Sequence, residues 1–129
     1  MLNDTLANTL SVILNYEKAG KKETIVSPAS KLIRKVLKIM NDHGYIGKYE
    51  DMSEAKGGFI KVNLLGCINN CCVIKPRFSA TLDEFEKFEK RFLPAKGVGI
   101  IILSTSQGMM VLGEAKKKGI GGRLIAYCY

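Results

Sequence analysis

Short polar side chains cluster in the last third of the chain, in the run Ser104, Thr105, Ser106, Gln107 and Gly108. A hydroxyl in such a run could act as a nucleophile beside a base, but the run lacks the glycines that flank a strained nucleophile elbow. The only histidine, His43, falls where a helix is predicted to end, a position typical of a cap. Short hydroxyls also hydrogen-bond phosphates, ribose and base edges. The run therefore favours binding over hydrolysis, and we predict no catalytic residue and no enzyme.

A second group with chemical potential is the set of cysteines, Cys67, Cys71, Cys72 and Cys128. Four thiolates could hold zinc, but structural zinc sites usually take paired ligands from two knuckles, and the second knuckle here would be a lone C-terminal residue. The sequence contains no Cys-x-x-Cys pair, so a redox role is not favoured. We therefore predict small buried thiols and no metal, with a thiol- or zinc-dependent interaction domain as the alternative.

Nucleotide chemistry is not favoured either. The glycines Gly119, Gly121 and Gly122 lack the Gly-Lys-Ser/Thr ending of a phosphate-binding loop, and no dinucleotide fingerprint opens a helix there. The acidic cluster between Asp83 and Glu89 lies at the start of a predicted helix, where negative charge is favourable without any catalytic role. We predict no cofactor and no small-molecule substrate.

The charge of the chain points to a polyanionic partner. Twenty Lys and Arg against 12 Asp and Glu give 129 residues a formal charge of +8. The excess is concentrated in residues 1–49, with eight cations against four anions, and in residues 96–129, with five against one. The N-terminus lacks the features of a secretory signal, and the longest apolar run, Val98–Leu103, is too short to span a bilayer. The composition predicts a soluble intracellular protein that binds nucleic acid and no membrane.

Periodicity predicts how these residues are positioned in the first half. Apolar spacing predicts a helix over 6–14 that ends at Gly20, followed by a strand over 24–26. Pro28 and Ser30 precede a second helix, whose buried stripe is Ile33, Val36, Leu37 and Met40. Its other face carries four cations, Lys31, Arg34, Lys35 and Lys38, which fit either a counter-charged partner or an ordinary solvated surface. With strands over 45–49 and 59–64, residues 1–66 form an α-β-α-β-β domain.

The second half is predicted to be mainly β, with one longer and one short helix. A strand over 73–78 precedes Thr81, which has capping-box spacing to Glu84. The helix that follows buries Leu82, Phe85, Phe88 and Phe92. The apolar run 100–103 predicts a central strand, residues 114–118 a short basic helix, and residues 123–129 a closing strand. We therefore expect an α+β fold of two small domains, 1–66 and 67–129.

Several motifs carry a specific resemblance. They are Ser104–Gly108, Glu114-Ala115 and Gly121-Gly122 near the C-terminus, and Asn15, Glu17-Lys18, Pro28–Lys31, His43–Gly47 and Pro76–Phe78 elsewhere. In order and spacing the chain resembles small-subunit ribosomal protein eight, in its archaeal and eukaryotic branch. The resemblance implies a two-domain protein of the cytoplasmic small ribosomal subunit that binds a helical region in the central domain of its rRNA early in assembly. It also implies neighbouring ribosomal proteins as partners and no cofactor.

The resemblance also indicates which residues contact RNA. The family's contacts would fall on the Ser104–Gly108 run, on Gly121 and Gly122, and on Ser30 and Lys31. Further cations would add salt-dependent affinity: Lys31, Arg34, Lys35, Lys116, Lys117 and Arg123. Tyr127 would stack on a base or donate a hydrogen bond, or else pack in the edge of the sheet. The hypothesis requires the hydroxyl run and the Gly-Gly bend to lie side by side on a cationic surface.

One departure from the family affects the basic helix. Val111-Leu112-Gly113 stands where the family has polar, acidic residues that cap this helix, so we expect a short or frayed helix supported by packing of Leu112. The same RNA-binding surface would also suit a free translational regulator, for example one that binds its own messenger, and the sequence leaves that alternative open.

Overall fold

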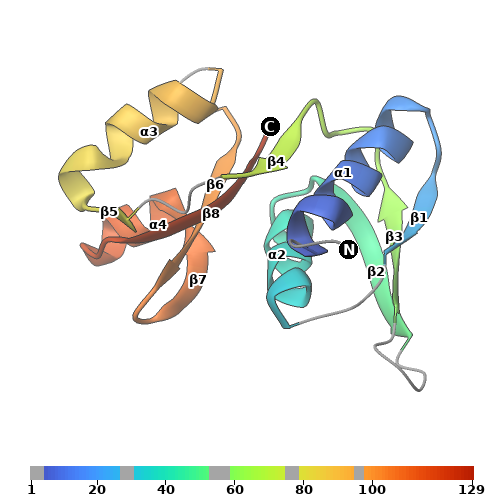
Figure 1. Cartoon of the computed structure of the whole chain (residues 1–129), viewed down its shortest axis with the longest axis horizontal. Coiled ribbons are helices and arrows are strands. Elements are labelled where there is room, and N and C mark those ends of the chain that lie inside the picture. Colours follow the sequence, from blue (N-terminus) through green and yellow to red (C-terminus); the bar gives the residue numbers. More distant parts are fainter. Residues whose placement is uncertain (1–4, 27–30, 53–58, 75–78, 95–97) are drawn as a thin grey trace. The chain divides into compact units, whose positions relative to one another are not determined.

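The chain divides into two compact units, residues 1–71 and 72–129, which we call the N-terminal and C-terminal units. The structure is a computed structural model and describes residues 5–26, 31–52, 59–74, 79–94 and 98–129. Each unit combines helices with an antiparallel sheet, so the predicted α+β class is confirmed (Figure 1). No helix in these ranges is long and apolar enough to cross a membrane.

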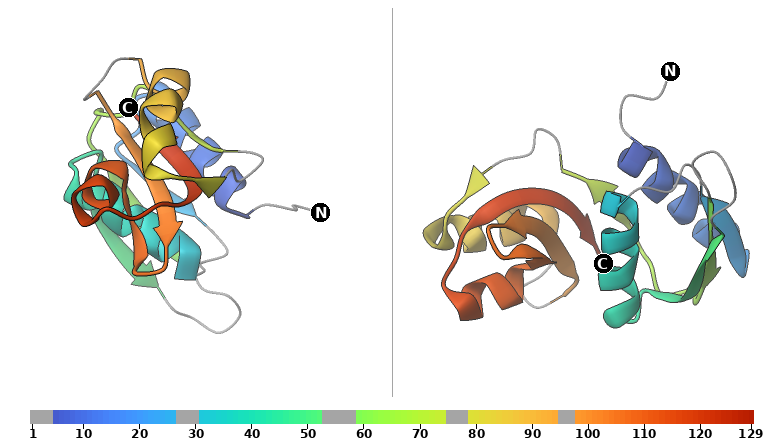
Figure 2. Two further views of the ribbon diagram at one scale, coloured as in Figure 1. Left: turned by 90° about the vertical axis from the view of Figure 1, so that its left-hand side faces the viewer. Right: turned by 90° about the horizontal axis from the view of Figure 1, so that it is seen from below.

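The N-terminal unit has the predicted order α-β-α-β-β. Its elements are α1 (Thr5–Lys18), β1 (Glu23–Val26), α2 (Lys31–Asp42), β2 (Ile46–Met52) and β3 (Phe59–Leu64). The strands form an antiparallel sheet in the order β1-β3-β2, and both helices cover one face of it (Figure 2). All four residues of the predicted α2 stripe are buried: Ile33, Val36, Leu37 and Met40. The cations of α2 therefore lie on the opposite side of the helix.

The end of α2 is closed by glycine rather than by His43. Gly44 has φ 78°, in the left-handed region that a residue without a Cβ enters at no cost. Its N–H donates to the carbonyl of Asn41 at 3.0 Å, and the next N–H, of Tyr45, donates to the carbonyl of Met40 at 2.9 Å. This pair of bonds is the Schellman pattern. His43 itself is exposed, so the predicted capping role passes to the backbone of its neighbour.

Among the described residues, the C-terminal half contains two strands more than the sequence pattern predicted. Its elements are β4 (Cys71–Val73), β5 (Ser79–Ala80), the 3₁₀ turn η1 (Leu82–Glu84), α3 (Phe85–Phe92), β6 (Ile100–Thr105), β7 (Gly108–Val111), α4 (Leu112–Lys118) and β8 (Gly122–Cys128). The sheet order is β4-β8-β6-β7, and β5 also pairs with β8. The strand predicted over 73–78 begins earlier, and residues 75–78 lie outside the described residues. The two unpredicted strands are β5, which pairs with β8, and β7, which forms a hairpin with β6.

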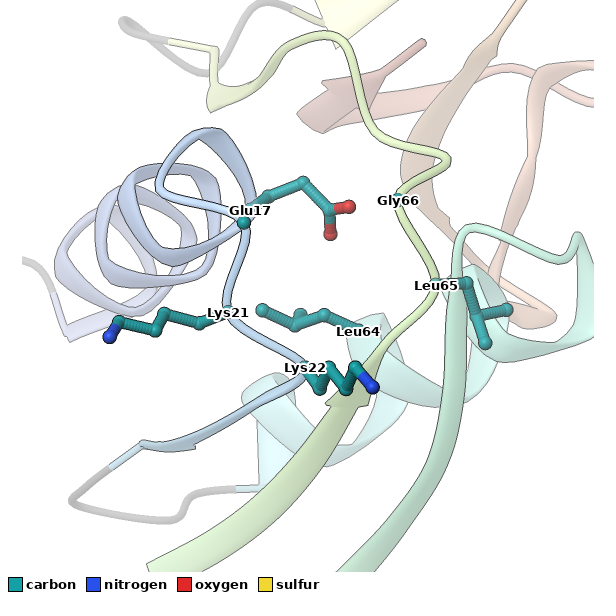
Figure 3. Close-up of a pocket in the computed structure, with 7 residues that line it drawn as sticks. Glu17, Lys21, Lys22, Leu64, Leu65 and Gly66 are labelled. Carbon is teal, nitrogen blue, oxygen red and sulfur yellow. The ribbon is translucent and has the colours of Figure 1, made fainter.

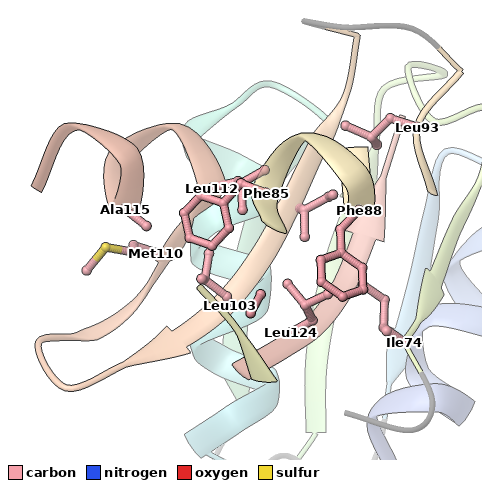
Figure 4. Close-up of a cluster of buried hydrophobic side chains, with 11 residues drawn as sticks. Ile74, Phe85, Phe88, Leu93, Leu103, Met110, Leu112, Ala115 and Leu124 are labelled. Atoms are coloured by element: carbon pink, nitrogen blue, oxygen red, sulfur yellow. The ribbon is translucent and has the colours of Figure 1, made fainter. Parts of the chain in front are cut away.

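One hydrophobic core holds the C-terminal unit together (Figure 4). Helices α3 and α4 pack Phe85, Phe88 and Ala115 against Leu103 and Leu124 of the two central strands. The four residues that begin β6, Ile100–Leu103, are all buried, as predicted for a central strand. Leu82 is 41% exposed, so its assignment to the buried stripe was wrong. Residues 82–84 form a 3₁₀ turn, which does not continue the 3.6-residue period of α3.

Both described helices of this unit start as their local sequences predict. The Glu84 carboxylate accepts hydrogen bonds from the N–H of Thr81 at 3.3 Å and from its hydroxyl at 3.0 Å, which confirms the predicted capping box. Helix α4 has only seven residues, its N-cap residue Val111 makes no side-chain cap, and it is anchored by Leu112, which is 4% exposed. The prediction of a short helix supported by Leu112 is therefore confirmed.

Candidate nucleic-acid interface

The hydroxyl run forms the tip of the β6–β7 hairpin. Thr105 pairs with Gly108, and Ser106 and Gln107 make the connection. The hydroxyl of Thr105 donates to the carbonyl of Gly108 at 2.8 Å and accepts from the N–H of Gln107 at 3.1 Å. Ser106 and Gln107, like Ser104, are exposed. Thr105 thus fixes the turn from within, while its neighbours present their side chains to solvent.

The Gly-Gly bend lies directly against this hairpin. A Cβ at Gly122 would stand 2.5 Å from the carbonyl oxygen of Ser104 and 2.9 Å from Cγ2 of Thr105. A Cβ at Gly121 would stand 2.5 Å from the carbonyl oxygen of Ala80, at the end of β5. Only residues without a side chain allow these strands to approach so closely. The structure therefore brings together the two features whose juxtaposition the sequence hypothesis required.

Arg123 lies in the same part of the sheet. On β8 it pairs with Ser104 of β6 on one side and with Ser79 of β5 on the other. All three side chains are exposed. Sequence reasoning missed Ser79, because a two-residue strand has no periodicity and nothing local links residues 79 and 123. The Pro76–Phe78 motif just before it was the one available signal.

The cations of α4 are not equivalent. Lys116 forms an ion pair with Glu89 of α3, a carboxylate only 12% exposed, so much of its charge is engaged within the unit. Lys117 is exposed on the last turn of the same helix, as is Lys118. Of the two α4 cations assigned to RNA, Lys117 is therefore the more available.

Tyr127 takes the packing role that the sequence allowed as its alternative. Its ring is half-buried and stacks on Phe92 at 5.5 Å between centroids and on Tyr129 at 6.1 Å. Phe92 continues the series to Phe88 at 6.4 Å. Because rings already cover Tyr127, base stacking on it has less support than the contacts of the hairpin.

The remaining predicted contacts lie in the N-terminal unit. Lys31 and Lys35 are exposed on α2, whereas Arg34 is half-buried and takes part in interactions within the protein. Ser30 lies outside the described residues. The exposed lysines provide a cationic surface on this unit, in keeping with the predicted basic helix face.

The prediction that the cysteines are buried holds for only two of the four. Cys71 and Cys128 are buried, but Cys67 and Cys72 are exposed, and none of the four forms a disulfide. The reason is local: Cys67 lies in a connector, and Cys72 alternates with Cys71 along the short strand β4. Within the described ranges, no three His, Cys, Asp or Glu side chains gather in a group that could hold a metal ion.

A separate hollow of about 430 Å³ lies beside the end of α1 (Figure 3). Glu17 lines it together with Lys21, Lys22, Leu64 and Gly66, among others. Burial raises the pKa of the Glu17 carboxyl, and a hydrogen bond from the backbone of Gly66 offsets this only in part. The oxygen Oε2 of Glu17 is buried without a hydrogen-bond partner among the described residues.

We expect Glu17→Gln to stabilise the protein at neutral pH. The raised pKa of Glu17 means that the folded state prefers the protonated carboxyl, so its stability falls as pH rises through that pKa. Glutamine is uncharged and keeps an oxygen for the bond from Gly66. Thermal unfolding should give a higher midpoint for the variant at pH 7, and the difference should shrink below the ordinary glutamate pKa of about 4.3. An equal gain in Glu50→Gln, which changes an exposed carboxylate, would contradict this explanation.

Residues 4–129 match the family model described as ribosomal protein S8. The match extends through both units and includes the β6–β7 hairpin, the Gly-Gly bend and Arg123.

Proposed function

Because the chain belongs to the ribosomal protein S8 family, whose members are rRNA-binding structural proteins of the small subunit and not enzymes, we propose that it binds a helical region in the central domain of small-subunit rRNA. In this proposal it acts early in the assembly of the cytoplasmic small subunit and offers surface to neighbouring ribosomal proteins. The observation that carries the proposal is the contact of Gly122 with Ser104 and Thr105 on an exposed, cation-bearing part of the sheet.

The hairpin supports binding through rigidity and small size. The two hydrogen bonds of the Thr105 hydroxyl preorganise the turn, so less conformational entropy is lost when RNA docks. The exposed hydroxyls of Ser104 and Ser106 need little room and can bond phosphates, ribose hydroxyls or splayed bases. Gly121 and Gly122 carry no side chain, which lets the strands beside them pack closely and holds the hairpin against β8. Recognition would therefore depend mainly on the shape of an irregular RNA helix.

The cations supply affinity that depends on salt. Each lysine or arginine that neutralises a phosphate releases condensed counterions, whatever the RNA sequence. We assign this role to Arg123 and Lys117 in the C-terminal unit, and to Lys31 and Lys35 on α2, since all four are exposed. Lys116, Arg34, Ser30, Gln107, Gly108 and Tyr127 complete the proposed set of contacts.

Two substitutions separate the two kinds of contact. Ser106→Ala removes an exposed hydroxyl and should weaken binding to a central-domain rRNA fragment about fivefold, the equivalent of one hydrogen bond of about 1 kcal/mol. It should leave binding to an unrelated RNA unchanged. Lys31→Ala should weaken binding to both RNAs and lower the slope of log K against log salt by about 1. Filter binding over a series of salt concentrations measures both effects.

Equal losses on the two RNAs for both variants would reject this division of roles. Sedimentation of the tagged protein tests the proposal as a whole, because a structural component should travel with small subunits. A protein that binds RNA but stays outside those fractions would instead be a free regulator.

A further inference from the structure

Three exposed polar residues form a row across adjacent strands at the hairpin end of the C-terminal sheet. Ser79 of β5 pairs with Arg123 of β8, and Arg123 pairs with Ser104 of β6. The next pair along, Leu103 and Leu124, is fully buried in the core. Because side chains alternate between the two faces of a sheet, the row points away from that core. Three residues that carry a hydroxyl, a guanidinium and a hydroxyl thus lie in neighbouring register positions on one face.

The position of Ser79 is held by close backbone packing. Its neighbour Ala80 pairs with Gly122. The carbonyl oxygen of Ala80 lies only 2.5 Å from the position that a Cβ of Gly121 would take. The short strand β5 is therefore fitted against β8 through two residues that have no side chain. Neighbouring strands are about 4.8 Å apart, so the backbone positions of the two serines lie about 10 Å apart, one on either side of Arg123.

The chemistry of the row matches a ribose-phosphate backbone. A guanidinium donates hydrogen bonds and accepts none, which suits a phosphate. A serine hydroxyl both donates and accepts, which suits a ribose 2′-hydroxyl, a group with the same two capacities. Among the described residues, Arg123 has no ion-pair partner that would compete for a phosphate. The wide, shallow minor groove of an RNA helix displays its 2′-hydroxyls to a flat surface of this kind.

We propose that Ser79 is a binding residue and that the row Ser79–Arg123–Ser104 selects RNA over DNA. Arg123 takes a phosphate, and the two serines bond the 2′-hydroxyls on either side of it. This inference rests on the proposed function, since it extends the same RNA from Ser104 and Arg123 to one further strand, β5.

Two nearly isosteric variants test the role of the Ser79 hydroxyl. Ser79→Thr keeps a hydroxyl and Ser79→Val replaces it by a methyl group, and both β-branched residues suit a strand. Binding is measured for the full chain with a central-domain rRNA hairpin and with a DNA hairpin of the same sequence. Ser79→Val should bind the RNA about fivefold more weakly than the native chain and the DNA equally well. Ser79→Thr should stay within about twofold of the native protein on RNA.

The outcomes separate this inference from the proposed function. Native affinity for RNA in Ser79→Val, or an equal loss on RNA and DNA, would overturn the role of Ser79 while leaving rRNA binding intact. If the native protein does not prefer the central-domain hairpin to an unrelated RNA hairpin, the proposed function fails. The ratio of RNA to DNA affinity for the unrelated sequence still decides whether Ser79 reads the 2′-hydroxyl.

Discussion

Gly122→Ala is expected to destabilise the C-terminal unit by about 1–3 kcal/mol, the usual range for forcing an extra methyl group into a packed site. The added Cβ would lie 2.5 Å from the carbonyl oxygen of Ser104, which is backbone and cannot turn aside as a side chain can. The strands β6 and β8 must therefore separate where Ser104 pairs with Arg123. Urea denaturation of the native and variant chains measures the loss.

The same substitution should also weaken RNA binding in the fraction that remains folded. The hairpin tip and the row on β8 are positioned by the contact that the methyl group disrupts, and a binding site loosened by a fraction of an ångström loses its best hydrogen bonds. We expect the affinity for the central-domain fragment to fall at least about tenfold, as for the loss of one hydrogen bond to a charged group. Binding is measured at a temperature where the variant is folded by circular dichroism.

Gly113→Ala is the matched control within the same unit. Gly113 lies in α4, is exposed, and has nothing within 4 Å of the position its Cβ would take. Alanine is favoured over glycine in a helix by about 1 kcal/mol, so this variant should be slightly more stable than the native chain. Similar losses of stability in both variants would show that the close packing of Gly122 is not the cause.

Elements with strong local patterns could be predicted from the sequence. The α2 stripe and the buried strand β6 each repeat a single period over several residues, and the structure buries the residues assigned to them. The capping box at Thr81 and the uncapped start of α4 are also local, because each depends on residues within one helical turn.

The missed features depend on partners distant in the sequence. Strand β7 has only four residues between a two-residue turn and a helix, so its extended form is decided by pairing with β6 rather than by its own periodicity. The ion pair between Lys116 and Glu89 joins two residues that are 27 positions apart in the sequence, and it reduces the cationic character of a predicted contact. No single-sequence pattern reports such pairings.

In the candidate interface, too, some features follow from the local sequence and others depend on residues distant in the chain. The types of residue in the Ser104–Gly108 run, and the resemblance of its motif, predict binding from the sequence alone. The separate roles within the run required the structure, because the hydroxyl of Thr105 is used inside the turn while those of Ser104 and Ser106 face solvent. Ser79 joined the site only through its register with Arg123.

Arg123→Ala is expected to lower rRNA affinity about ten- to hundredfold, because hydrogen bonds to a charged group contribute about 1.5–3 kcal/mol. The slope of log K against log salt should fall by about 1, the effect of losing one phosphate contact. Stability should change by no more than about 0.5 kcal/mol, since the side chain is exposed and has no ion-pair partner among the described residues. Arg123 would then be a contact that binding requires and folding does not.

Two further variants distinguish a positioned contact from general charge. Arg123→Lys keeps the charge but loses the planar fork that bonds a phosphate through two N–H groups, so it should keep the salt slope and recover only part of the affinity. Lys90→Ala removes an exposed cation from α3, away from the row, and should change affinity by less than about threefold. If Lys90→Ala and Arg123→Ala weakened binding equally, the RNA would be held by the overall positive field of the unit, and the row Ser79–Arg123–Ser104 would have no special part in it.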